Sequence, residues 1–260
     1  MAMLTVRMNA ESLKRQTVFE LFLPNDPVSG KMPPESPMNT LFLLHGYRSG
    51  PEFWLPEELA RKYRLAVVMP NGENSFWLDG ISTGHAFGTL IGEELPAYLQ
   101  KTFGLAQSRE HTFLMGVSMG GFGALRTALA CPGRFGKAAA FSAALIQHEV
   151  AEMQPGKGNF VANFEYYREC FGEPAAVLQS DKNPEYLAER LLNAGKPLPE
   201  LYLCCGTEDF LLEPNRAFHR FLTAHGIAHT YREDKGGHDM QFWRRFAPEA
   251  LAWLAGENEE

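Results

Sequence analysis

The chain has 260 residues, of which 45% are hydrophobic and 12% aromatic, so it is long enough to bury a large core and too apolar to stay disordered. Its formal net charge is -7 without a clustered basic stretch, which argues against a nucleic-acid partner and against binding to an anionic membrane surface. No apolar run of about 18 residues occurs, and the first residues lack the apolar middle of a signal peptide, so we expect a cytoplasmic protein.

Short apolar runs alternate with helical patterns along the chain, which is typical of a mainly parallel sheet covered by helices on both faces. The first two strand candidates, "MLTVRMN" and "TVFELFLP", adjoin the proline-rich loop at residues 24–38 and are expected to pair antiparallel at the sheet edge. Later strand candidates occupy residues 40–46, 65–70, 111–116, 137–143 and 201–206. Helical patterns occupy residues 56–63, 88–104, 119–132, 213–226 and 239–256. We therefore predict one α/β domain over residues 1–260, with its ligand site at the carboxyl ends of the strands.

Residues 144–198 interrupt this alternation and are predicted to form a small cap inserted over the strand ends. The stretch "NFEYYRECFGEPAAVLQSDKNPEYLAERLL" within them is helical and aromatic in patches. Substrate choice is expected to depend on this region, where an aromatic residue either accepts a ring of the substrate or anchors the cap. The aromatic residues concerned are Phe160, Phe164, Tyr166 and Tyr167.

A glycine-rich turn joins the strand candidate at 111–116 to the helix that follows. Gly116-Val117-Ser118-Met119-Gly120 fits G-x-S-x-G, the strained turn that lifts a serine side chain above an α/β sheet. Side chains at the two flanking glycines are expected to collide with neighbouring backbone, and Gly121 and Gly123 are expected to bring the helix close to the sheet. We predict that Ser118 is a nucleophile at a helix N-terminus, the alternative being a turn that only packs a helix.

A serine nucleophile needs a base and a third group that orients the base, and in this fold they follow in the order serine, acid, histidine. Asp209 follows a strand candidate in "LYLCCGTEDFLLEP", and His238 lies in the glycine-flanked loop of "REDKGGHDMQFW". Because both positions lie just past strand ends, we predict Asp209 as the acid and His238 as the base. Glu208 and Glu213 remain alternatives for the acid.

The oxyanion hole needs two backbone N–H groups, one from the residue after the nucleophile and one from a loop after an earlier strand. Met119 follows Ser118, and "TLFLLHGYRSG" supplies the loop. We predict the N–H groups of Tyr47 and Met119 as donors, with Gly46 as the alternative to Tyr47. His45 is expected to hold the loop by hydrogen bonds rather than to act as a second base.

Several of these stretches together resemble the esterase D family, most closely its small tributyrin esterase-like members, over about residues 3 to 254. They are "LLHGYRSG", "NSFWLDG", "GVSMGGFGAL", "SDKNPEYLAERL", "GTEDFL" and "GGHDMQFW". The resemblance implies an α/β-hydrolase fold, no cofactor and hydrolysis of short acyl esters. It also implies the roles of nucleophile, acid and base for Ser118, Asp209 and His238, and of oxyanion donors for Tyr47 and Met119.

Two positions depart from the family pattern. Relatives often carry a second glycine soon after the histidine-glycine pair, whereas here Tyr47 and Arg48 precede Ser49, which puts the shape of the oxyanion loop in doubt. Trp77 stands where relatives frequently have tyrosine, and a bulky ring there is expected to narrow the substrate pocket. We predict Phe76 and Trp77 as substrate-binding residues, with core packing as the alternative.

The sequence thus predicts a serine carboxylesterase that hydrolyses acetyl- or butyryl-type esters through an acyl-enzyme. The alternatives are an S-formylglutathione hydrolase or a feruloyl or acetyl-sugar esterase with the same triad and, less favoured, an acyltransferase or a non-catalytic binding scaffold. The expected partner is a small-molecule ester, with no cofactor, metal, nucleic acid or membrane, and a homo-oligomer is left open. The cysteines lack the spacing of a metal site and are expected to be structural thiols: Cys131, Cys170, Cys204 and Cys205.

Overall fold

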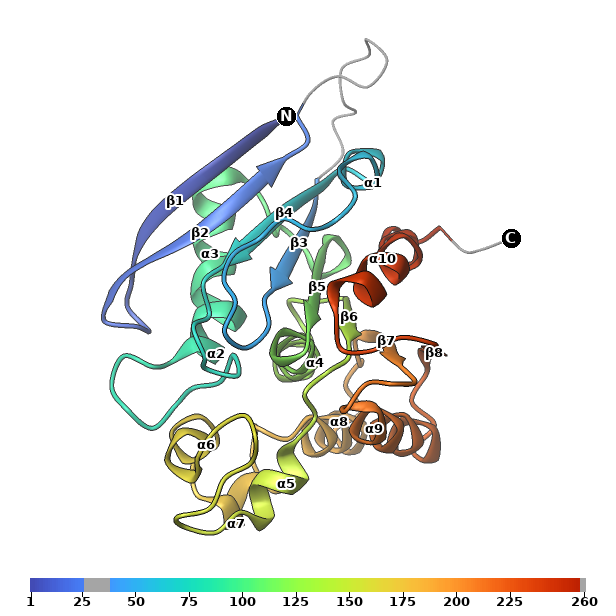
Figure 1. The fold of residues 1–260 in the computed structure, drawn as a ribbon. Helices are drawn as coiled ribbons and strands as arrows, with labels where there is room; N and C mark the ends of the chain where they lie inside the picture. The colour runs from blue at the N-terminus through green and yellow to red at the C-terminus, as the bar shows by residue number, and fades with distance from the viewer. Residues whose placement is uncertain (26–37, 258–260) are drawn as a thin grey trace.

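A computed structural model describes residues 1–25 and 38–257, so the predicted proline-rich loop at 24–38 lies almost entirely outside the described residues. The described residues form one eight-stranded sheet in the order β1-β2-β4-β3-β5-β6-β7-β8 (Figure 1). The strands are β1 (Ala2–Ala10), β2 (Arg15–Leu23), β3 (Asn39–Leu44), β4 (Leu65–Pro70), β5 (Thr112–Val117), β6 (Lys137–Phe141), β7 (Glu200–Gly206) and β8 (His229–Asp234). β1 and β2 pair antiparallel at one edge, and the strands from β4 to β8 in the sheet order run parallel, which confirms the predicted architecture.

Helices cover both faces of the sheet, so β4 and β5 are buried at every position. This explains why their sequences are continuously apolar and do not alternate between apolar and polar residues. α1 (Glu57–Lys62) and α10 (Met240–Ala255) contact each other and pack on one face. The other face carries α3 (Leu95–Phe103), α4 (Met119–Ala130) and α9 (Leu212–Ala224) (Figure 1). The two apolar cores therefore lie on opposite sides of the same sheet.

The predicted helix at 88–104 is built from three pieces. α2 (Phe87–Thr89) runs into a π-helical turn, η1 (Leu90–Glu94), and then into α3, which ends at Gly104 with φ 66°. Pro96 in the first turn of α3 has no N–H to donate, and the wider π turn lies directly before it. A short 3₁₀ helix, η2 (Arg109–His111), then leads into β5.

The chain between β6 and β7, where the cap is predicted at 144–198, contains four described helices. α5 (Gln147–Glu152), α6 (Phe164–Phe171) and α7 (Pro174–Val177) lie beyond the carboxyl end of the sheet (Figure 1). α8 (Pro184–Asn193) instead packs against α4 and belongs to the helical layer on that face. Only the first part of the segment therefore stands over the strand ends.

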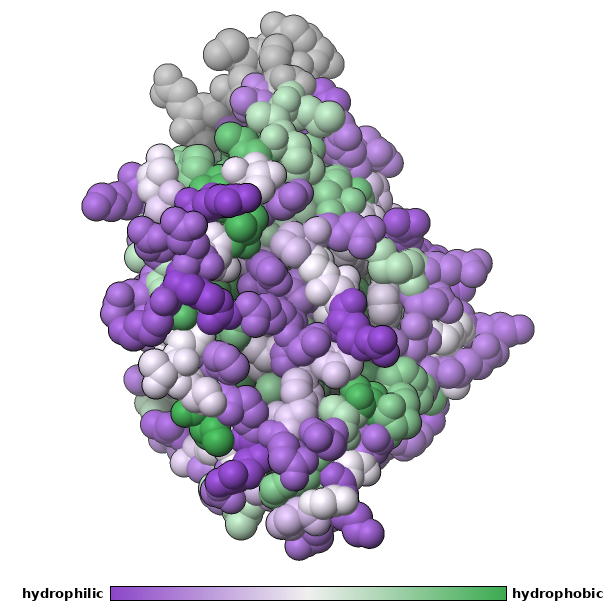
Figure 2. Space-filling view, turned by 60° about the vertical axis from the view of Figure 1, so that its left-hand side comes forward, coloured by the Kyte–Doolittle hydropathy of each residue, from purple (hydrophilic) through white to green (hydrophobic). Residues whose placement is uncertain are grey.

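Hydrophilic residues cover most of the face in Figure 2, and hydrophobic residues appear there in separate groups. Within the described ranges, no helix combines the length and the apolar character needed to cross a bilayer.

Candidate active site

The turn between β5 and α4 places Ser118 in a backbone conformation that residues with side chains rarely adopt, with φ 55° and ψ -119°. Its N–H donates to the Phe141 carbonyl at 2.8 Å, and its own carbonyl accepts from the Ala144 N–H at 3.0 Å. Neighbouring backbone at the end of β6 thus holds the strained residue in place, as is common at functional sites.

The flanking glycines are required by close backbone contacts. A methyl group on Gly116 would lie 2.2 Å from the Gly120 carbonyl oxygen, and one on Gly120 would lie 2.0 Å from the Leu44 carbonyl oxygen. Real side chains essentially never approach backbone below 3.0 Å, so both positions exclude any side chain, as the sequence predicts. The close approach to Leu44 also places α4 directly against β3, the strand that leads into the loop of His45, Gly46 and Tyr47.

Ser118, His238 and Asp209 are brought together from three different strand ends. His238 Nε2 lies 2.9 Å from Ser118 Oγ, and its Nδ1 lies 2.9 and 3.1 Å from the two carboxylate oxygens of Asp209. Ser118 follows β5, Asp209 follows β7 and His238 follows β8. The alternative acids Glu208 and Glu213 are both exposed, and Glu213 pairs with Arg216 instead. The geometry is that of a nucleophile, a base and an orienting acid.

Asp209 is buried at 6% exposure, and hydrogen bonds keep it ionised. Burial by itself raises the pKa of this carboxyl, but hydrogen bonds from His238, the Leu211 N–H and the Ser142 hydroxyl outweigh it and hold the pKa below its ordinary value. The Leu211 N–H lies 2.8 Å from Oδ1. A carboxylate that remains charged at neutral pH can stabilise an imidazolium on His238.

Ser142 and Trp243 support this carboxylate and were not among the residues singled out from the sequence. Ser142 is fully buried with φ 46°, and its Oγ accepts a hydrogen bond from the Trp243 indole N–H at 3.0 Å. The Trp243 ring also meets the His238 ring edge to face, at 5.1 Å between centroids. In the sequence, the only indication of this hydrogen-bond network is that Ser142 directly follows a buried strand.

The loop after β3 lies beside Ser118. A methyl group on Gly46 would be only 3.4 Å from Ser118 Cβ. His45 Nε2 accepts from the Gly72 N–H at 2.9 Å, so its Nδ1 carries the proton and donates to the Gly46 carbonyl at 2.8 Å. Burial lowers the pKa of His45, which therefore stays neutral. This confirms the structural role predicted for His45.

Tyr47 and Met119, the predicted oxyanion donors, both border the space around Ser118. Met119 opens α4, whose N-terminus carries partial positive charge. Arg48, next to Tyr47, has φ 60°, and its N–H donates to Asn74 Oδ1 at 2.8 Å. The loop after β3 lacks the second glycine that relatives often carry. Its backbone at Arg48 is instead held by the hydrogen bond to Asn74 in a neighbouring loop.

Phe76 and Trp77 lie in that second loop, both with positive φ, at 53° and 57°. Trp77 is fully buried, and its indole N–H donates to the His45 carbonyl at 3.2 Å. A methyl group on Gly123 would lie 2.5 Å from the Trp77 ring, so this glycine makes room for the indole. The prediction that Trp77 binds substrate is wrong, because its ring is fully buried and packs against His45 in the loop after β3. Phe76 is 3% exposed but borders a cavity at Ser118.

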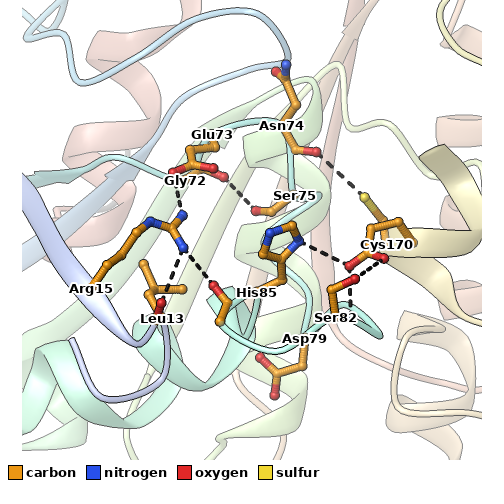
Figure 3. Close-up of polar contacts among 12 residues, drawn as sticks. Leu13, Arg15, Gly72, Glu73, Asn74, Ser75, Asp79, Ser82, His85 and Cys170 are labelled. Carbon is orange, nitrogen blue, oxygen red and sulfur yellow. Dashed lines mark hydrogen bonds and ion pairs between the residues drawn. The ribbon is translucent and has the colours of Figure 1, made fainter.

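Polar contacts fasten the loop that carries Phe76 and Trp77 to the start of β2 and to α6 (Figure 3). Figure 3 shows Arg15 beside Glu73, Ser75 bonded to the Gly72 carbonyl, and the Cys170 thiol facing the Asn74 carbonyl. Glu169 of α6 accepts from Ser82 and lies 3.1 Å from His85. The two strained aromatic residues are therefore held from both sides.

Two cavities meet at Ser118, His238 and Tyr47. The first, of about 230 Å³, lies between the loop after β3 and the start of α10; its lining includes Trp54, Val117, Met240, Trp243 and Glu52. The second, of about 330 Å³, lies under the loop between α5 and α6; its lining includes Phe76, Glu149, Asn159, Phe160, Tyr167 and Phe210. A larger hollow of about 450 Å³ near Cys131 and Arg134 includes none of the site residues.

In the part of the chain that the structure describes, no group of three or more His, Cys, Asp or Glu residues is placed to hold a metal ion. The four cysteines are free thiols. Burial raises the pKa values of Cys170 and Cys205 to about 12, so neither is a thiolate near neutral pH.

Known proteins resemble the chain over nearly its whole length. Residues 10–254 match the family described as "Putative esterase". An acetyl esterase of Caldicellulosiruptor saccharolyticus is 36% identical over 262 residues, covering 98% of each chain. Among solved structures, the fluorophosphonate-binding serine hydrolase FphF of Staphylococcus aureus has a TM-score of 0.83 at 25% identity, with 99% of each chain covered. The S-formylglutathione hydrolase FrmB of the same organism has a TM-score of 0.81 at 26% identity, with 98% of each chain covered. The fold is that of the α/β-hydrolases, as the sequence predicts.

Proposed function

Because the chain belongs to the esterase family that its residues 10–254 match and is a carboxylic ester hydrolase, we propose that it is a serine carboxylesterase for short-chain acyl esters. The observation that carries the proposal is the continuous contact from Ser118 through His238 to Asp209, with 2.9 Å at each of its two links. The strained turn that exposes Ser118 beside the loop of Gly46 supports the same role.

In the proposed mechanism, Ser118 Oγ attacks the ester carbonyl carbon while His238 Nε2 accepts the hydroxyl proton. Asp209 stabilises the imidazolium, and the N–H groups of Tyr47 and Met119 hold the oxyanion. The C–O bond to the alcohol then breaks, and the alcohol takes the proton from His238. Water repeats the attack on the acyl-enzyme and releases the acid. Each oxyanion donor contributes about 2.7 to 4 kcal/mol of transition-state stabilisation.

The size of the site supports a short acyl group. The smaller of the two cavities at Ser118 holds about 230 Å³, and the bulky rings of Trp54 and Trp243 are part of its lining. The relative with 36% identity is named an acetyl esterase. The finer assignment to the tributyrin esterase-like members, the cytoplasmic location and an association of several copies remain predictions.

A substrate panel with matched variants tests the proposal. Wild type is compared with Ser118→Ala and Asp209→Asn on p-nitrophenyl acetate, butyrate and octanoate, with Ser108→Ala as a serine control at the start of η2. We expect preference for acetate or butyrate, near-complete loss in Ser118→Ala, a loss of about 10⁴-fold in kcat for Asp209→Asn, and no change in the control. Wild-type activity in Ser118→Ala would refute the assignment of the nucleophile, and preference for octanoate would refute the short acyl group.

A further inference from the structure

The hollow of about 450 Å³ near Cys131 and Arg134 lies at the opposite edge of the sheet from Ser118. Its lining comes from η1, from α3, from the loop that leads into β5 and from the loop between α4 and β6. Loops that precede parallel strands lie at the amino edge of a sheet, whereas Ser118 follows β5 at the carboxyl edge. The hollow is therefore a separate place from the candidate active site.

Two guanidinium groups line the hollow without a carboxylate at ion-pair distance among the described residues. Arg109 Nη2 donates to the Leu198 carbonyl at 2.7 Å, and the buried Arg109 Nε has no hydrogen-bond partner in the described part of the chain. Arg134 is half-buried, and its side chain makes no ion pair or hydrogen bond with another described residue. Because a guanidinium carries several N–H donors, both groups keep donors that a ligand can use.

The nearby carboxylates leave the hollow with an excess of positive charge. Glu110 is exposed, and it accepts from its own N–H and from the Ser108 hydroxyl. Glu93 lines the hollow but forms no ion pair with either arginine. The lining therefore carries the positive charges of Arg109 and Arg134 against the negative charge of Glu93, in a chain whose formal net charge is -7.

The sign of this charge distinguishes the hollow from the two cavities at Ser118. Among the described residues, Glu52 and Glu149 line those cavities, and no lysine or arginine does. An anion is repelled by the carboxylates beside Ser118 and attracted by the arginines of the hollow. Of these three places, the hollow is the one suited to an anionic ligand.

The rest of the lining is polar and has a closely built wall. Gly92 in the π turn η1 lies so near Cys131 that a methyl group on Gly92 would be 2.9 Å from Cys131 Sγ. Such π turns occur frequently at functional sites. Gln100 and Gln107 donate through their amide nitrogens to backbone carbonyls, which leaves their amide oxygens to accept from a ligand. The volume leaves room for an organic body besides the charged group.

We propose that Arg109 and Arg134 bind an oxyanion, which makes the hollow a second ligand site for a small phosphate ester or carboxylate that bears hydroxyl groups. Guanidinium groups bind both kinds of oxyanion through paired N–H donors, so the two sources share one chemistry. The hydroxyl groups of the ligand donate to Gln100 and Gln107. The inference goes beyond the proposed function and does not depend on it.

Calorimetry at fixed ionic strength tests the class of ligand. The probes are inorganic phosphate, glycerol 3-phosphate, malate and, as an uncharged control, glycerol. We expect glycerol 3-phosphate or malate to bind about 3-fold more tightly than inorganic phosphate, because each adds hydroxyl contacts to the charged group. The tighter of the two identifies the source as a phosphate ester or a carboxylate. Binding of none of the three anions, or equal binding of glycerol, would overturn the inference.

Charge variants test the residues that hold the anion. Arg134→Gln should weaken binding of the preferred anion about 10-fold, and Arg134→Lys should weaken it less. Glu93→Gln should strengthen binding about 2-fold, because it removes a repelling charge, and damage to the fold would not produce that result. Arg7→Gln, an exposed arginine of β1, is the matched control and should bind as wild type does. Unchanged affinity in both Arg134→Gln and Glu93→Gln would overturn the site.

Two measurements locate the anion relative to the esterase site. Affinity for the preferred anion should be the same in Ser118→Ala as in wild type, and a saturating concentration should not raise the KM of wild type for p-nitrophenyl acetate. The anion should also raise the urea midpoint of wild type but not that of Arg134→Gln. Loss of binding in Ser118→Ala together with a raised KM would place the anion at Ser118 and overturn the inference. Anion binding by a wild type without esterase activity would refute only the proposed function.

Discussion

Replacing Gly120 with alanine is a sharp test of how the fold positions Ser118, the proposed nucleophile, because two physical effects predict opposite results. Glycine is a poor helix former, so alanine in α4 should stabilise the helix by about 1 kcal/mol. The added methyl group, however, would lie 2.0 Å from the Leu44 carbonyl oxygen and 2.8 Å from that of His45. Since carbon and carbonyl oxygen normally stay roughly 3.3 Å apart, the end of β3 or the first turn of α4 must move by about 1 Å.

The displacement acts on the site because β3 leads into the loop of Tyr47, the proposed oxyanion donor, and α4 begins directly after Ser118. Overpacking of this kind costs about 1 to 3 kcal/mol of stability, which outweighs the gain in helix propensity. A misplacement of about 1 Å in a catalytic arrangement lowers the rate about 100-fold. We therefore expect lower stability together with a fall of about 100-fold in kcat/KM.

Urea unfolding and hydrolysis of p-nitrophenyl acetate measure the two effects on the same preparation. Gly133→Ala is the matched control, because a methyl group there would meet nothing within 4 Å. It should keep wild-type activity and lose no stability. A Gly120→Ala protein that is more stable than wild type and equally active would refute the reasoning.

Two further predictions concern buried polar groups near the site. Ser142→Ala removes a donor to Asp209, so the pKa of Asp209 should rise toward its ordinary value of 3.8. Because the pKa of Asp209 is lower in the folded protein than in the unfolded chain, its ionised carboxylate stabilises the fold at pH values above 3.8. Ser142→Ala should therefore lower the free energy of unfolding measured in urea by about 1 kcal/mol at pH 7, and this loss should shrink as the pH falls below 3.8. His45, whose pKa burial lowers from 6.5, takes up a proton more readily in the unfolded chain, so wild-type stability should fall as the pH drops below 6.5. His45→Gln should reduce this dependence of the free energy of unfolding on pH. The same slope of that free energy between pH 7.5 and 5 in wild type and variant would contradict the assignment of His45 as neutral.

The sequence predicted the main elements of the site because they depend on local patterns. Apolar runs placed the strands, and G-x-S-x-G placed Ser118 at a strand-to-helix turn whose flanking glycines the structure shows to be sterically required. The carboxyl ends of parallel strands share one edge of the sheet, so candidates after β7 and β8 were expected near Ser118. The structure places Asp209 and His238 there, within hydrogen-bond distance.

The sequence predicted less about features that depend on tertiary packing. Trp77 was expected at the substrate because of its size and position, but its ring fills the space left by Gly123. Ser142 escaped notice because its partners, Asp209 and Trp243, come from distant parts of the chain. The amphipathic pattern of α8 did not reveal which layer the helix joins, and the structure places it against α4.

The most direct test of the account is covalent labelling by a fluorophosphonate ester, followed by peptide mapping. In the proposed site, Ser118 Oγ displaces fluoride from phosphorus with help from His238, and the stable product blocks the enzyme. We predict one label per chain, on Ser118, with esterase activity lost in proportion to labelling and with little labelling in His238→Ala. A label on another residue, or full activity in protein labelled at Ser118, would contradict the central claim.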